Sequence, residues 1–145
     1  MASNPIPAVT HPAPERRKAS LRALIFGLAA APLAWSTQTI VGYGVASRAC
    51  FPGDTPRSTP AFAYVWSAVL TVNVIALMVG LLGTLVAFMS WSATRQEHGG
   101  RPTYLMDVGE GRTRFLAMCG ILVGAGFVVA ILFTTLTVAL ASACR

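Results

Sequence analysis

Three long stretches of this sequence contain no charged residue, at 23–46, 61–91 and 115–143. Even the shortest, with 24 residues, would form a helix of ~36 Å at ~1.5 Å per residue, and the hydrocarbon core of a bilayer is ~30 Å thick. The chain is 54% hydrophobic and only 11% charged, which is outside the range of ordinary soluble domains. The sequence therefore predicts an all-α integral membrane protein with three transmembrane helices.

The polar segments between these stretches define the domain organisation. We expect one transmembrane domain over 21–145, with helices at about 22–47, 61–91 and 113–143. The residues before it, 1–20, contain four prolines and no apolar periodicity. Such a composition cannot bury enough apolar surface to fold, so we expect a disordered tail.

The lysines and arginines are divided unequally between the two ends of the expected helices. Eight of the 11 lie in the tail, at its border with the first helix and in the segment 92–114, whereas the segment 47–60 and the C-terminus hold three. Because cytoplasmic loops carry an excess of these residues, we expect the N-terminus and 92–114 in the cytoplasm and the C-terminus outside. Contacts with anionic lipid headgroups then explain the net charge of +6, and no nucleic-acid partner is expected.

This threading brings two of the three cysteines to one side of the membrane. Cys50 and Cys144 each follow the end of a helix on the non-cytoplasmic side, where disulfides form and persist. We therefore expect a Cys50–Cys144 bridge, with Cys119 left unpaired near the cytoplasmic end of the third helix. No C-x-x-C pair of the kind used in thiol catalysis is present in the sequence.

Polar and small residues mark the expected contacts between helices. Trp35, Gln38 and Gly42 share one face of the first helix, and Gln38 in hydrocarbon needs a hydrogen bond to another helix or to a partner protein. A stripe of small residues with one amide follows the second helix: Asn73, Ala76, Gly80, Gly83 and Ala87. Gly120 and Gly124 form a G-x-x-x-G spacing in the third. We expect these positions to pack helices closely or to contact a partner.

The three uncharged stretches contain no histidine, and Arg22 and Arg114 lie only at the borders of the expected helices. Haem ligation, proton relays and ion pathways inside a membrane usually need such residues. The sequence also offers no nucleophile–base arrangement and no set of metal ligands. We therefore expect no catalytic residue, no cofactor and no metal site.

Two stretches resemble the first and last helices of a group of small three-helix bacterial inner-membrane proteins. The first stretch contains Pro32-Leu-Ala-Trp35, Gln38, Gly42-Tyr43 and Cys50-x-Pro52, and the second contains Gly111-Arg-Thr-Arg-Phe-Leu116, Gly120-Ile121 and Cys144. The chain departs from this group at Gly124, where serine is expected, and at Ala143, where proline is common. Proteins of this group are encoded beside haem–copper terminal oxidase subunits and their assembly factors. The resemblance implies a respiratory setting and no catalytic residues.

We therefore expect a non-catalytic accessory or assembly subunit of an inner-membrane respiratory complex, in particular a haem–copper (cytochrome c) oxidase. Its expected surroundings are the lipids of the bacterial inner membrane, and its expected partners are terminal oxidase subunits or assembly factors. Two alternatives stay open. One is a small oligomeric transporter or channel in which Pro32, Gln38 and Asn73 line a path, and the other is a membrane thiol–disulfide protein that uses Cys50 and Cys144.

Overall fold

The structure, a computed structural model, describes residues 20–95, 108–140 and Cys144. Within these residues the chain is helical and has no strand. Its elements are three long helices and one short 3-10 helix: α1 (Leu21–Cys50), η2 (Pro52–Asp54), α2 (Val65–Arg95) and α3 (Val108–Leu140). All three long helices are long and apolar enough to cross a membrane, which agrees with the predicted fold class.

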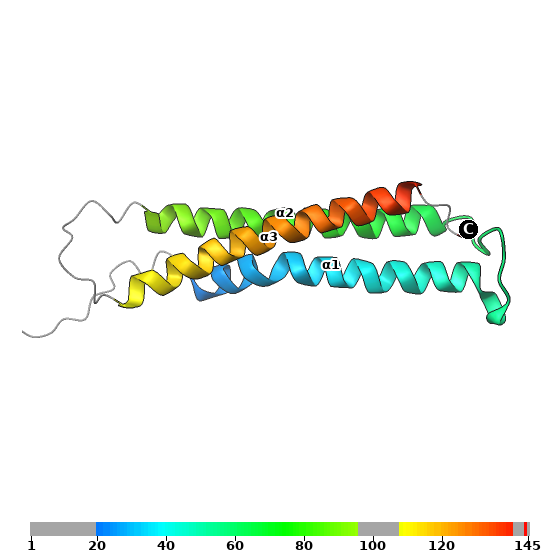
Figure 1. Ribbon diagram of the computed structural model, residues 1–145, viewed down its shortest axis with the longest axis horizontal. Coiled ribbons are helices and arrows are strands. Elements are labelled where there is room, and N and C mark those ends of the chain that lie inside the picture. The colour runs from blue at the N-terminus through cyan, green and yellow to red at the C-terminus, as the bar shows by residue number, and fades with distance from the viewer. Residues whose placement is uncertain (1–19, 96–107, 141–143, 145) are drawn as a thin grey trace, which may run out of the picture.

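The three helices form one elongated bundle (Figure 1). Helices α1 and α3 run in the same direction, α2 runs the opposite way, and α3 crosses the other two at a shallow angle. The orientation with the N-terminus in the cytoplasm stays a prediction. The predicted disordered tail lies outside the described residues apart from Ser20.

The ends of α1 are fixed by local hydrogen bonds. The Ser20 hydroxyl accepts a hydrogen bond from the Ala23 N–H at 3.1 Å, a common way to begin a helix. At the other end α1 extends to Cys50, beyond the predicted end at residue 47. A charged residue such as Arg48 ends an uncharged run, but it does not interrupt the backbone hydrogen bonds of a helix.

The connection between α1 and α2 folds back onto the end of α1. The Arg57 N–H donates to the Cys50 carbonyl and the Ala61 N–H to the Ala49 carbonyl, both at 2.9 Å. Because Ala61 is held in this way, α2 begins at Val65, four residues after the predicted start. The connection thereby fixes where α2 starts relative to the end of α1.

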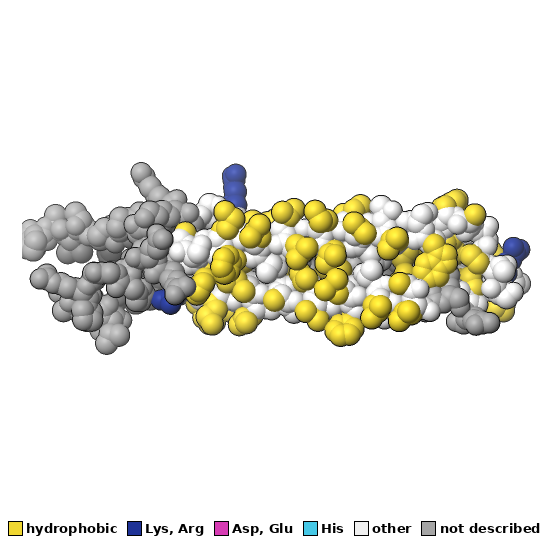
Figure 2. Space-filling view, turned by 90° about the horizontal axis from the view of Figure 1, so that it is seen from above, with side chains coloured by type: hydrophobic (Ala, Val, Ile, Leu, Met, Phe, Trp, Pro, Cys, Tyr) yellow, Lys and Arg dark blue, Asp and Glu magenta, His cyan; other side chains and the backbone are white. Residues whose placement is uncertain are grey.

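Small side chains lie inside the bundle and large apolar side chains lie outside. Buried positions on α1 include Gly27, Ala30, Ala31 and Ala34, whereas side chains such as Leu33 are exposed. Figure 2 shows one face of the molecule, on which apolar side chains extend along the described part of the bundle and lysine and arginine side chains lie toward its two ends. This distribution is typical of helices that pack together in a lipid environment, where large side chains face the acyl chains.

Candidate functional site

All three helices come close together around Gly27, Ala87 and Gly120, one residue from each helix. A Cβ atom added to Gly27 would lie 3.0 Å from the Ala87 Cβ, and one added to Gly120 would lie 3.1 Å from the same atom. The Cβ added to Gly120 would also lie 3.4 Å from the carbonyl oxygen of Gly27. At this level, which we call the glycine layer, the absence of side chains lets three backbones meet.

Three predicted packing residues extend this close contact along the bundle. A Cβ added to Gly83 would lie 2.7 Å from the Ala30 Cβ, and one added to Gly124 would lie 2.5 Å from the Thr84 hydroxyl oxygen. A Cβ added to Gly80 would lie 3.3 Å from side-chain carbons of both Ile131 and Val128 on α3. The stripe on α2 and the G-x-x-x-G spacing on α3 therefore lie at helix–helix contacts.

An apolar layer follows, in which Ala34, Ala76 and Ile131 pack together. Trp35 packs against this layer, and its ring lies 5.5 Å from that of Phe127 on α3, measured between centroids. Trp35 thus makes a contact between α1 and α3. Gly42, predicted to share the face of Trp35, is not at a helix contact within the described residues, since a Cβ added there would meet none of their atoms within 4 Å.

One helical turn beyond the apolar layer, each helix contributes a polar side chain: Gln38 from α1, Asn73 from α2 and Thr135 from α3. We call these three residues the polar layer. The Thr135 hydroxyl donates a three-centre hydrogen bond to two acceptors. These are the Asn73 Oδ1 at 3.1 Å and the Ile131 carbonyl of its own helix at 2.8 Å. The Asn73 Nδ2 donates to the Val69 carbonyl at 2.8 Å. Asn73 thereby links α2 to α3.

Gln38 is the exception in this layer. Its side chain is 2% exposed, and neither its Nε2 nor its Oε1 has a hydrogen-bond partner among the described residues. A buried amide without a partner costs roughly 1–3 kcal/mol. Since nearly all buried polar groups in native proteins are paired, Gln38 is an exception among the described residues.

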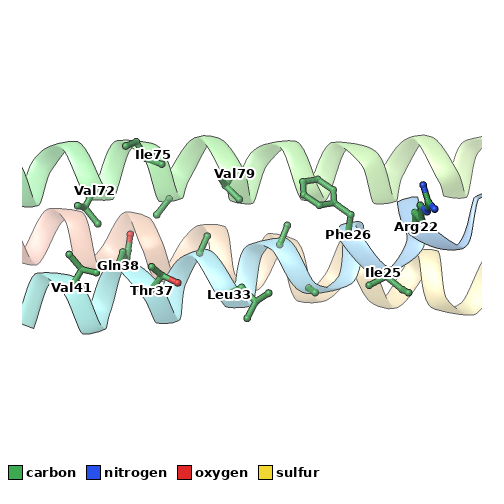
Figure 3. A pocket seen from close by; sticks show the side chains of 14 residues that line it. Arg22, Ile25, Phe26, Leu33, Thr37, Gln38, Val41, Val72, Ile75 and Val79 are labelled. Carbon is green, nitrogen blue, oxygen red and sulfur yellow. The ribbon is translucent and has the colours of Figure 1, made fainter.

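Gln38 also lines an open groove between α1 and α2 (Figure 3), on the side of this pair away from α3. The groove has a volume of about 750 Å³ and an almost wholly apolar lining. Ten of its residues come from one face of α1 between Arg22 and Val41, and the other four come from α2: Val72, Ile75, Ala76 and Val79. Gln38 lies toward one end of this α1–α2 groove and Arg22 lies at the other.

At the end of the bundle where α1 ends and α2 begins, apolar side chains pack together and a disulfide is present. Ala49, Val65 and Val69 pack together between α1 and α2. Cys50 is bonded to Cys144, with their α-carbons 5.3 Å apart, so the predicted bridge is present in the structure. Cys119 is a free thiol, half-buried on α3.

Sequence reasoning missed Gly27, Thr135 and the groove. Gly27 lies three residues before Ala30 and four before Ala31, so the spacing of small residues on the first helix was a signal that could have found it. Thr135 stands in an apolar helix next to another threonine, and hydroxyls there usually bond to their own helix, which hides an interhelical role. The groove depends on how α1 and α2 pack, which the sequence does not specify.

The polar groups inside the described bundle are amides and hydroxyls, which bind through hydrogen bonds and do not supply a nucleophile with its base. Among the described residues, no group of three or more histidine, cysteine, aspartate or glutamate side chains could hold a metal ion. The arrangement is therefore suited to association between helices. In comparisons with protein-family models, curated proteins and solved structures, no match to this chain was found.

Proposed function

We propose that this chain is a non-catalytic accessory or assembly subunit of a membrane protein complex. The observation that supports this proposal is the buried carboxamide of Gln38, which has no partner among the described residues and lines an open apolar groove. A polar group placed in hydrocarbon favours helix association because lipid tails offer no hydrogen bond. A subunit that completes its interior by binding a partner fits these features.

The kind of complex is proposed from the sequence. The resemblance carried by Trp35, Gln38, Cys50 and the last helix favours a haem–copper (cytochrome c) oxidase or one of its assembly intermediates in the bacterial inner membrane. The excess of lysine and arginine around the tail and residues 92–114 supports an orientation with the N-terminus in the cytoplasm. In that orientation the Cys50–Cys144 bridge lies on the oxidising side of the membrane.

The alternative of a thiol–disulfide enzyme is less favoured by the site. Cys50 is 4% exposed, and exchange requires a thiolate to reach one of the two sulfur atoms. A structural bridge that ties the C-terminal segment to the end of α1 is the simpler role.

The proposed function is tested by purifying the full-length tagged chain from native membranes in a mild detergent and identifying what accompanies it by mass spectrometry. An equally expressed, tagged membrane protein of unrelated function serves as the control. We expect oxidase subunits or oxidase assembly factors to be enriched with this chain and not with the control. Recovery of the chain as a lone species, or with proteins unconnected to respiration, would contradict the proposal.

A further inference from the structure

The α1–α2 groove and Gln38 together restrict what can bind there. The α1 face of the groove runs from Arg22 to Val41, which is ~28 Å of helix at ~1.5 Å per residue. This length is close to the ~30 Å thickness of the hydrocarbon core. An acyl chain from one leaflet reaches only about half that distance, whereas a transmembrane helix covers all of it.

The lining of the groove suits the backbone of a helix. Ala30, Ala34 and Ala76 line its middle and are almost fully buried within the bundle, and side chains this short leave room above them for another helix to approach. Leu33 and Ile75, which also line the groove, are 64% and 58% exposed and offer apolar contact to an incoming helix.

Gln38 requires that a helix bound in the groove carry hydrogen-bonding groups at the level of this side chain. Its Nε2 needs an acceptor and its Oε1 needs a donor, because neither atom has a partner in the part of the chain that the structure describes. A hydroxyl on a partner helix meets this need only in part, because it has a single proton, and helical threonines share that proton with the carbonyl four residues earlier, as Thr135 does here. A carboxamide both donates and accepts, and it can form two hydrogen bonds with Gln38 at once.

We propose that the α1–α2 groove binds a transmembrane helix of a partner protein, and that this helix carries an asparagine or glutamine at the depth of Gln38. The inference rests on the proposed function, because it names the surface through which an accessory subunit would be held. In the lone chain the carboxamide is turned inward, where it avoids lipid. Rotation about its side-chain bonds between staggered positions brings it to the docked helix.

The proposal is tested by crosslinking from two neighbouring threonines of α1. Thr37 lines the groove, whereas Thr39 is exposed and does not line it, and the two differ in depth by only ~3 Å. Thr37→Cys and Thr39→Cys are each made in a full-length tagged chain carrying Cys119→Ser, and each is labelled with a benzophenone maleimide in native membranes. After irradiation, the products are sized and the attached peptides are sequenced by mass spectrometry.

We expect Thr37→Cys to give a protein adduct at least fivefold more abundant than the adduct from Thr39→Cys. The attached peptide should come from an apolar segment of another protein, with an asparagine or glutamine within about one turn of the attachment point. Adding Gln38→Leu to Thr37→Cys should reduce the adduct at least fivefold. The purified Gln38→Leu chain should keep its helical circular dichroism and its Cys50–Cys144 bridge, which shows that the loss is not due to unfolding.

Four results would overturn the groove proposal: equal adducts from both threonines, adducts to lipid alone, an adduct with the mass of two copies of this chain, or an adduct unaffected by Gln38→Leu. The two proposals also fail separately. If oxidase subunits accompany the Gln38→Leu chain as they accompany the wild type, the groove proposal fails and the proposed function stands. If the crosslinked helix belongs to a protein outside respiratory complexes, the proposed function fails and the groove proposal stands.

Discussion

The glycine layer and the polar layer hold the same three helices together by different means. Around Gly27, Ala87 and Gly120 the helices meet through shape, and a single added carbon would lie about 3 Å from its neighbours. In the polar layer they meet through hydrogen bonds, and one of its three members, Gln38, has none among the described residues. At the glycine layer the three helices are in close contact within one chain, whereas in the polar layer the hydrogen bonding among the described residues is left open at Gln38. The difference locates where a second protein is expected to bind.

The largest expected effect comes from filling the space between α1 and α2 at Gly83. In Gly83→Leu, even the first added carbon would lie 2.7 Å from the Ala30 Cβ, so the helices must separate. Overpacking of this kind costs about 3 kcal/mol of unfolding free energy. The measurement is unfolding by sodium dodecyl sulfate in mixed micelles, followed by circular dichroism.

Gly126→Leu is the matched control for this change. It lies on α3, and a Cβ there meets nothing within 4 Å. Replacing a glycine in an exposed helix interior should stabilise by about 0.5–1 kcal/mol. Equal losses in the two variants would show that close approach at Gly83 is not what holds the helices together.

The next effect comes from removing the bridge at the far end of the bundle. The double change Cys50→Ser and Cys144→Ser should lower the unfolding free energy by about 1 kcal/mol, less than the ~2–4 kcal/mol typical of soluble proteins, because the bilayer already confines the unfolded chain. Cys119→Ser should change it little. Non-reducing mass spectrometry of the wild type should find the Cys50–Cys144 peptide and an alkylatable Cys119. Two free thiols at Cys50 and Cys144 would contradict both the bridge and the threading.

A smaller effect is expected in the paired part of the polar layer. Asn73→Leu and Thr135→Val each remove the hydrogen bond between α2 and α3, and a double-mutant cycle should give a coupling energy of about 0.6 kcal/mol. Thr134→Val is the control, because the Thr134 hydroxyl donates to Ala130 of its own helix. Additive losses from Asn73→Leu and Thr135→Val would mean that the bond contributes nothing to stability.

The sequence predicts which residues share a packing face of one helix, but it does not predict which residues of a neighbouring helix they contact. The spacing of Asn73, Gly80 and Gly83 placed them on one side of α2, because residues three or four apart share a helical face. The same spacing does not say that Gly83 meets Ala30 or that Asn73 meets Thr135. Those pairings depend on how far each helix is shifted along its neighbours.

The disulfide was predictable for a different reason. Positive charges indicated that Cys50 and Cys144 lie on the same side of the membrane, and both follow the ends of uncharged stretches. Gln38 was predicted to need a partner on chemical grounds. That Gln38 has no hydrogen-bond partner among the described residues depends on how α1, α2 and α3 pack, because a sequence cannot show which hydrogen bonds remain unmade.

Gln38→Leu tests the central claim most directly, namely that Gln38 serves association with another protein more than the fold of this chain. In purified protein, unfolded by the same titration, the account predicts no loss of stability and a gain of about 0.5 kcal/mol, because the change removes a buried amide that has no hydrogen bond. Asn73→Leu, measured alongside, should lose about 1 kcal/mol because its amide is bonded. If Gln38→Leu loses as much as Asn73→Leu, Gln38 is paired within the chain and the account is wrong.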